Sequence, residues 1–216
     1  MRDIFHEELE AINETLLRMS GLVKEALSDA TKALLTADLQ LAEKVIAADD
    51  VIDQIQHDLD NRTINLMARQ QPVASDLRNL VSTLRMSADL ERMGDLAHHV
   101  AKTARMRFPS CAVPEVLTTI IVDMEKTATA IGEKLSTIIQ YKDVTRALEL
   151  DKDDDAMDEL HRKLIAVLLS DDWSFGIETA IDMTLLGRYY ERFGDHAVSI
   201  ANRVHFTVTG EYVPAE

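Results

Sequence analysis

The chain of 216 residues carries 38 acidic and 23 basic side chains, giving a formal net charge of -15. That charge repels phosphate backbones and anionic membrane surfaces, so direct binding of nucleic acid is not expected. The single cysteine, Cys111, excludes an intramolecular disulfide and a cysteine-based zinc site. No run approaches the roughly 20 apolar residues of a membrane span, and the first residues lack a signal-peptide pattern. We therefore expect a cytoplasmic protein.

Helical periodicity and sparse turn residues predict an all-α fold. Four prolines and seven glycines are too few for the many turns of a sheet protein. Apolar residues recur at spacings of three and four, for example between Leu41 and Leu59 and between Leu150 and Val167. Connections between the periodic segments are short, so neighbouring helices should run antiparallel. Six long helices are predicted, over residues 3–35, 38–70, 73–106, 115–140, 143–170 and 175–208.

The chain is predicted to divide into two three-helix bundles. The longest break between predicted helices runs from Arg107 to Pro114 and contains two prolines. Three predicted helices precede this break and three follow it. We therefore place the first bundle at residues 1–106, a linker at 107–114 and the second bundle at 115–212.

The two bundles are related by an internal duplication. The segment Glu91-Arg92-Met93-Gly94-Asp95 recurs 100 residues later as Glu191-Arg192-Phe193-Gly194-Asp195. Upstream, Asp49-Asp50-Val51-Ile52-Asp53 recurs 105 residues later as Asp154-Asp155-Ala156-Met157-Asp158. The difference between the two offsets indicates that the second copy has lost five residues around its middle turn. The chain therefore contains the same three-helix unit twice.

Acid pairs inside the repeated segments are the candidate functional residues. Their i, i+4 spacing puts both carboxylates on one helix face, where like charges repel. On the third predicted helix, the apolar stripe Leu77, Val81, Leu84, Ala88 continues into Glu91 and Asp95, so we expect this pair to point inward. Buried carboxylates need a counter-charge or a metal ion, and oxygen ligands suit Mg, Mn or Fe. The pairs are Asp49/Asp53, Glu91/Asp95, Asp154/Asp158 and Glu191/Asp195.

Spacing alone leaves two interpretations of these acids open. Arg92 and Arg192 follow the glutamates and Arg188 lies three residues before Glu191, so ion pairs could neutralise the charge without any metal. A metal site could instead be completed by a histidine. Four histidines lie three or four residues beyond an acid: His57, His98, His99 and His161.

The repeated Glu-Arg-x-Gly-Asp segments and the turn from Arg69 to Arg78 resemble the PhoU family. These are phosphate-transport accessory proteins that act as negative regulators of the bacterial phosphate response. The resemblance covers nearly the whole chain and implies two three-helix bundles side by side. It also implies multinuclear metal clusters of Fe, Zn, Mn or Mg on the family's E(D)xxxD motif, and we expect a homodimer. That motif maps onto Asp49/Asp53, Glu91/Asp95, Asp154/Asp158 and Glu191/Asp195.

The resemblance further implies regulation by contact. A PhoU protein couples the ATPase subunit of the phosphate ABC transporter to the sensor histidine kinase, and it represses the starvation response when phosphate is abundant. The membrane is then reached only through these partners. The chain has no glycine-rich phosphate loop, nucleophile elbow or catalytic triad, so no enzymatic activity is expected.

Two other hypotheses belong to different classes. A ferritin-like carboxylate-bridged metalloenzyme is one, because Asp95-x-x-His98 and Asp158-x-x-His161 resemble the Glu-x-x-His pattern of those proteins. The second copy of the first motif, however, has Val198 in place of the histidine. The other hypothesis is a helical scaffold whose acids bind no metal and only increase solubility.

Overall fold

The computed structural model describes residues 2–213; Met1, at the start of the predicted first domain, and Pro214 lie outside them. Six α-helices make up the described chain, which confirms the predicted fold class. Every predicted helix boundary lies within two residues of the observed one. The helices are α1 (Arg2–Thr36), α2 (Leu39–Gln70), α3 (Ser75–Arg107), α4 (Glu115–Tyr141), α5 (Val144–Leu168) and α6 (Gly176–Thr209).

The second helix of each half begins in the same way. Asp38 accepts a hydrogen bond from the backbone N–H of Leu41 at 3.0 Å, and Asp143 accepts one from that of Arg146 at 3.0 Å. An aspartate at this position satisfies a backbone donor that the first helical turn leaves free. Asp38 and Asp143 are 105 residues apart, so the duplication extends to the local signals that start α2 and α5.

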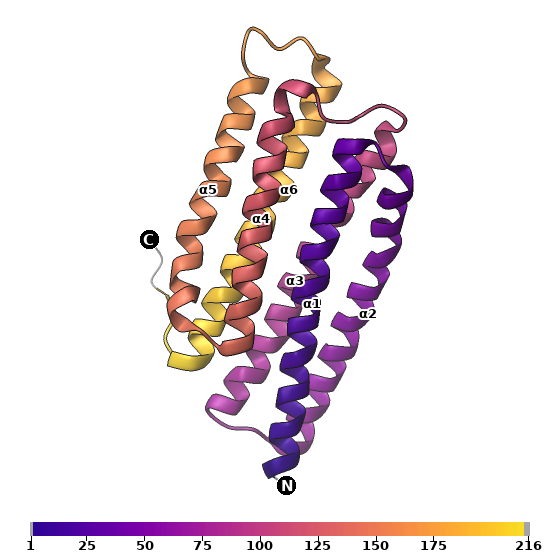
Figure 1. The fold of residues 1–216 in the computed structure, drawn as a ribbon. Helices are drawn as coiled ribbons and strands as arrows, with labels where there is room; N and C mark the ends of the chain where they lie inside the picture. The colour runs from indigo at the N-terminus through magenta and orange to yellow at the C-terminus, as the bar shows by residue number, and fades with distance from the viewer. Residues whose placement is uncertain (1, 214–216) are drawn as a thin grey trace.

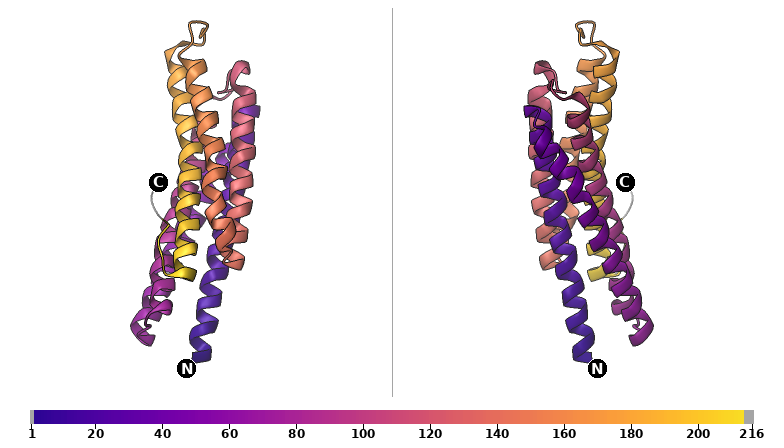
Figure 2. Two further views of the ribbon diagram at one scale, coloured as in Figure 1. Left: turned by 90° about the vertical axis from the view of Figure 1, so that its left-hand side faces the viewer. Right: turned by 90° about the vertical axis from the view of Figure 1, so that its right-hand side faces the viewer.

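Each half is an antiparallel three-helix bundle, and the two bundles lie side by side (Figure 1). Figure 2 shows that the first half reaches beyond the second half at the end where α1 begins. The halves meet where α1 packs against α4 and where α3 packs against α6. One hydrophobic cluster spans both halves, since Leu90 and Met93 of α3 are buried in the same core as Ile121 of α4 and Phe193 of α6.

Contacts between α3 and α6 show a pseudo-twofold relation between the halves. Ser199 of α6 donates a hydrogen bond of 2.9 Å to Asp89 of α3. Farther along, His99 of α3 stacks on Tyr189 of α6, with ring centroids 5.2 Å apart. Adding or subtracting 100 converts one residue pair into the other. The α2–α3 and α5–α6 turns consequently lie at opposite ends of the molecule (Figure 1).

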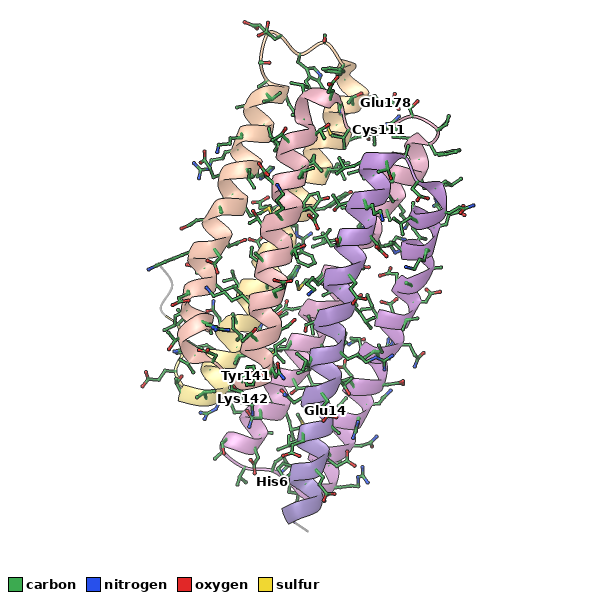
Figure 3. All side chains as sticks on the ribbon, in the orientation of Figure 1. His6, Glu14, Cys111, Tyr141, Lys142 and Glu178 are labelled. Atoms are coloured by element: carbon green, nitrogen blue, oxygen red, sulfur yellow. The ribbon has the colours of Figure 1, made fainter. Side chains whose placement is uncertain are left out.

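Ion pairs join α3 to α6 where α3 ends. Arg107 contacts Asp182 through Nε and Glu178 through a terminal nitrogen, both at 2.5 Å. Figure 3 places Glu178 near Cys111, in the segment that connects the halves. His6 and Lys142 lie towards the other end of the molecule. Among the helices of residues 2–213, none combines the length and apolar character needed to cross a membrane.

Candidate metal centre

The predicted acids of the first half meet where α2 packs against α3. Burial raises the pKa of Glu91 on α3, and the carboxylate of Asp95 raises it further. Asp53 and Asp49, on the facing helix α2, raise the pKa of Glu91 as well. Burial, followed by Asp49 and Asp95, raises the pKa of Asp53 in turn. The fold therefore brings the four carboxylates close enough for their charges to oppose the ionisation of Glu91 and Asp53.

The second half repeats this arrangement between α5 and α6. Burial raises the pKa of Asp154 to about 7, and the carboxylates of Asp195 and Asp158 are the next causes. Burial also raises the pKa of Asp195, to which Glu191 adds. All eight predicted site residues are thus gathered into two groups, one in each half, and each group is drawn from two helices.

Glycines allow the helices to approach closely at these groups. A Cβ atom at Gly94 would lie 3.1 Å from Cδ1 of Ile52 and 3.5 Å from Oδ1 of Asp49. At the equivalent Gly194, a Cβ atom would fall far inside the van der Waals distance of Oδ1 of Asp154. The repeated glycine is therefore explained by the approach of an aspartate-bearing helix. The carboxylate of Asp154 lies closer to its glycine than that of Asp49 does.

Internal cations partly neutralise the first group. Arg92 contacts Asp95 at 2.7 Å and Glu91 at 3.6 Å. On the other side of the group, Nδ1 of His98 makes a short contact with Oδ2 of Asp49. Asp53 is the remaining carboxylate; burial raises its pKa most, and the neighbouring carboxylates raise it further.

The second group is neutralised from different positions. Arg188 contacts Glu191, and Nδ1 of His161 lies 3.0 Å from Oε2 of the same glutamate. The 105-residue offset relates His161 to Gln56, so this contact has no counterpart in the first half. The two groups therefore have the same pattern of carboxylates but differ in the residues that neutralise their charge.

Two of the four candidate histidines reach the acid groups, namely His98 and His161. His57 instead lies 3.0 Å from the backbone oxygen of Asp53 on its own helix, through Nδ1. His99 stacks on Tyr189 between the halves. Sequence spacing could not show which histidines contact the acid groups, because all four follow an acid by three or four residues.

The predicted inward stripe on α3 is wrong. Leu77 and Val81 are exposed, and the buried face of α3 carries Leu80, Leu90 and Met93 instead. The core face also contains small or polar residues such as Ser87 and Gly94, which weaken its apolar pattern. The clearer apolar stripe in the sequence therefore lies on the outer face of α3. Glu91 and Asp95 continue that outer face and are half-buried beside α2 rather than pointing into the core.

The donor types of both groups fit a hard divalent cation, which prefers carboxylate oxygens and accepts imidazole in the case of Zn, Mn or Fe. Oδ1 of Asp154 is buried without a hydrogen-bond partner, as expected of an atom that lacks its ligand. Within residues 2–213, however, no three such side chains are arranged to enclose an ion. Ion binding would require Arg92 and Arg188 to release their carboxylates.

Fold and site together define a class: an internally duplicated helical protein with one carboxylate group in each three-helix bundle. The sequence model of the PhoU domain matches this chain twice, at residues 16–104 and 121–204. The chain belongs to the PhoU family, and each half is one PhoU domain.

Relatives and solved structures agree with this assignment. The phosphate-specific transport system accessory protein PhoU homolog 2 of Mycobacterium tuberculosis is 44% identical over 212 residues, covering 98% of this chain and 100% of that protein. A PhoU homolog of Clostridium acetobutylicum is 32% identical over 98% of this chain and 97% of its own length. The crystal structure of PhoU from Pseudomonas aeruginosa gives a TM-score of 0.84 at 30% identity, covering 96% of this chain and 100% of that one. That of the phosphate transport system regulatory protein PhoU from Streptococcus pneumoniae gives 0.86 at 27% identity, covering 98% and 100%.

Proposed function

We propose that this protein represses the phosphate-starvation response when phosphate is abundant. In this proposal it couples the ATPase subunit of the phosphate ABC transporter to the sensor histidine kinase in the cytoplasm. The observation that carries the proposal is the match of both halves to the PhoU domain, together with full-length relatives named as phosphate transport accessory proteins. An acidic chain of net charge -15 suits basic surfaces on such partners, and the encounter should weaken as ionic strength rises. We also propose that the protein forms a homodimer and has no enzymatic activity.

We further propose that each acid group binds divalent metal, with Fe, Zn, Mn and Mg as candidates. The ligands would be Asp49, Asp53, Glu91 and Asp95 in the first half and Asp154, Asp158, Glu191 and Asp195 in the second. A bound cation would supply the positive charge that four adjacent carboxylates lack. The raised pKa values of Glu91, Asp53 and Asp154 support this proposal, because burial and then the neighbouring carboxylates disfavour the negative charge that a bound cation would stabilise.

Deleting the gene tests the regulatory role. Expression of phosphate-starvation genes should stay high in the deletion strain when phosphate is plentiful, and a plasmid copy should restore repression. Normal repression in the deletion strain would contradict the proposal, provided that any second PhoU gene is deleted as well.

Metal analysis of the purified protein separates the remaining hypotheses. Stoichiometric metal without oxidase activity supports the regulator with structural or sensory metal. Metal with oxidase turnover would instead favour the ferritin-like metalloenzyme. If the protein retains no metal after anaerobic purification, the scaffold hypothesis is favoured, in which ion pairs balance the acids and no metal binds.

A further inference from the structure

Large exposed apolar residues occur at four equivalent positions in the two halves. One pair, Phe108 and Val208, lies near the ends of α3 and α6, and the other three pairs lie near the α2–α3 and α5–α6 turns. Single exposed apolar residues are normal on a protein surface and need no explanation. Here the 100-residue offset relates Leu77 to Ile177 and Val81 to Ile181, and the 105-residue offset relates Ile64 to Leu169. These six side chains are between 39% and 81% exposed. We call Ile64, Leu77 and Val81 the first apolar set and Leu169, Ile177 and Ile181 the second apolar set.

Substitution between the halves has changed the residue type at all three positions of these sets but kept each one large and apolar. The core does not require this, because the side chains point to solvent within the described chain. Hydrophobic residues that the fold does not bury, repeated in two copies, are typical of a surface that another molecule covers.

Neighbouring contacts fix where each set lies. Ser87 of α3 donates a hydrogen bond of 2.9 Å to Asp60 of α2, and this register places Ile64 level with the turn that contains Val81. Leu77 and Val81 are one helical turn apart on the same face of α3. The first set therefore lies beside the α2–α3 turn and the second beside the α5–α6 turn, at opposite ends of the molecule (Figure 1).

Each set is aligned with an acid pair on the same helix. Glu91 and Asp95 follow Leu77 and Val81 by 14 residues, and the second half keeps the same spacing. Fourteen residues are nearly four full helical turns, so the apolar and acidic pairs share one helix face about 21 Å apart. The outer face of α3, like that of α6, is thus apolar at one end and acidic in the middle of the helix.

We propose that each of these faces is the docking surface for a partner helix that is apolar at one end and basic about 14 residues farther along. This inference rests on the proposed function, since the partner is the transporter ATPase subunit or the sensor kinase. Charge complementarity favours such a helix. In the metal-free protein, Arg92 and His98 contact three of the four carboxylates in the first group, whereas Arg188 and His161 both contact Glu191 in the second. Negative charge is therefore left for lysine or arginine, most of it in the second group.

The charges disfavour a second copy of this chain as the occupant. Each copy has a net charge of -15. If the outer faces of α3 in two copies met in parallel, their carboxylate pairs would lie together and repel. If they met antiparallel, the carboxylates of one copy would lie against Leu77 and Val81 of the other. The pseudo-twofold relation between the outer faces of α3 and α6 instead suits two identical partner helices, such as those of a partner with twofold symmetry. One chain should therefore bind two partner subunits.

Binding to the purified ATPase subunit and to the cytoplasmic part of the kinase tests this inference. Calorimetry and sedimentation would be run on the full chain in buffer with a chelator, so that the carboxylates carry no metal. Three variants are compared: Leu77→Ser with Val81→Ser, Ile177→Ser with Ile181→Ser, and all four together. Val51→Ser with Val116→Ser is the matched control, since both residues are similarly exposed apolar positions outside the two sets.

Each two-residue variant should halve the stoichiometry from two partner subunits to one. The four-residue variant should weaken binding at least tenfold, and the control should bind like wild type. Circular dichroism checks that all variants remain helical. Unchanged binding by the four-residue variant would overturn this inference and leave the proposed function standing. A wild-type chain that binds neither partner would overturn both. If the variants instead dissociate a homodimer of the isolated chain, the occupant is a second copy and the inference is wrong.

Discussion

Gly194 of α6 lies directly against the carboxylate of Asp154 on α5, so closely that any Cβ at position 194 would overlap Oδ1 of that aspartate. The equivalent Gly94 leaves 3.5 Å between the same hypothetical atom and Asp49. Asp154 is therefore packed more tightly against its glycine than Asp49 is. Burial between the helices raises the pKa of Asp154 to about 7, and the carboxylates of Asp195, Asp158, Asp151 and Glu191 raise it further.

Gly194→Ala should destabilise the protein by about 1–3 kcal/mol, the usual cost of overpacking a close contact. The control is Gly21→Ala in α1, where no neighbouring atom lies within 4 Å of the added Cβ. The control should gain up to about 1 kcal/mol from better helix propensity. Urea denaturation of the two variants measures both effects. Equal stabilities would show that the side chain of Asp154 can move away from position 194 without cost.

The stability of the metal-free protein should depend on pH through Asp154. Its folded pKa of about 7 lies above the unfolded value, so the folded state binds more protons between about pH 4 and pH 7. The contribution of Asp154 to stability consequently falls as pH rises through this window and is constant above it. Asp154→Asn should therefore raise the melting temperature at pH 8 and change it little at pH 4. A variant that is less stable than wild type at pH 8 would contradict the assigned pKa.

The helices and the duplication could be predicted because their signals are local. Asp38 and Asp143 mark helix starts directly, and the Glu-Arg-x-Gly-Asp repeat appears in the sequence without any folding information. The orientation of α3 could not be predicted in the same way. Its outer face carries Leu77 and Val81, so periodicity identified an apolar stripe but could not show whether a core or a partner covers it.

The acid groups were only partly predictable for a similar reason. The i, i+4 pairs are visible in the sequence, but which histidine reaches them depends on contacts between helices. His98 contacts Asp49 across α2 and α3, and His161 contacts Glu191 across α5 and α6. The contact of Asp89 with His196 lies between the two halves and gave no local signal at all.

Asp89→Asn should weaken the contact between α3 and α6. Burial would raise the pKa of Asp89, but hydrogen bonds from His196 at 3.0 Å and Ser199 at 2.9 Å outweigh it and lower the pKa below its ordinary value. A depressed pKa contributes stability above the unfolded pKa, and this stability is lost as pH falls through the folded pKa. The variant should cost about 1–3 kcal/mol at pH 7 and progressively less below pH 4. Denaturation curves at both pH values measure this, with Asp171→Asn in an exposed turn as the control.

Glu91→Ala combined with Asp95→Ala should remove the metal of the first half and leave that of the second. The carboxylates of each group come from the two helices of one half, so the groups should bind independently. Metal content by mass spectrometry after loading with Mn²⁺ measures this, and circular dichroism confirms folding. Loss of all metal from a folded variant would mean that the halves or two subunits share the sites. Wild-type protein that holds no stoichiometric metal would refute metal binding itself.

Arg188→Gln should increase the affinity of the second group for Mn²⁺. Arg188 contacts Glu191 and is the arginine that a cation must displace from this group. Glutamine at position 188 removes the positive charge, so Glu191 becomes free to bind the ion without first breaking an ion pair. We expect the dissociation constant to fall by up to about tenfold, which corresponds to about 1.4 kcal/mol. Titration calorimetry with Mn²⁺ measures the change, and the first group in the same protein serves as the internal reference because its residues are unaltered. If the acids are instead balanced by ion pairs alone, the variant will lose stability and still take up no Mn²⁺.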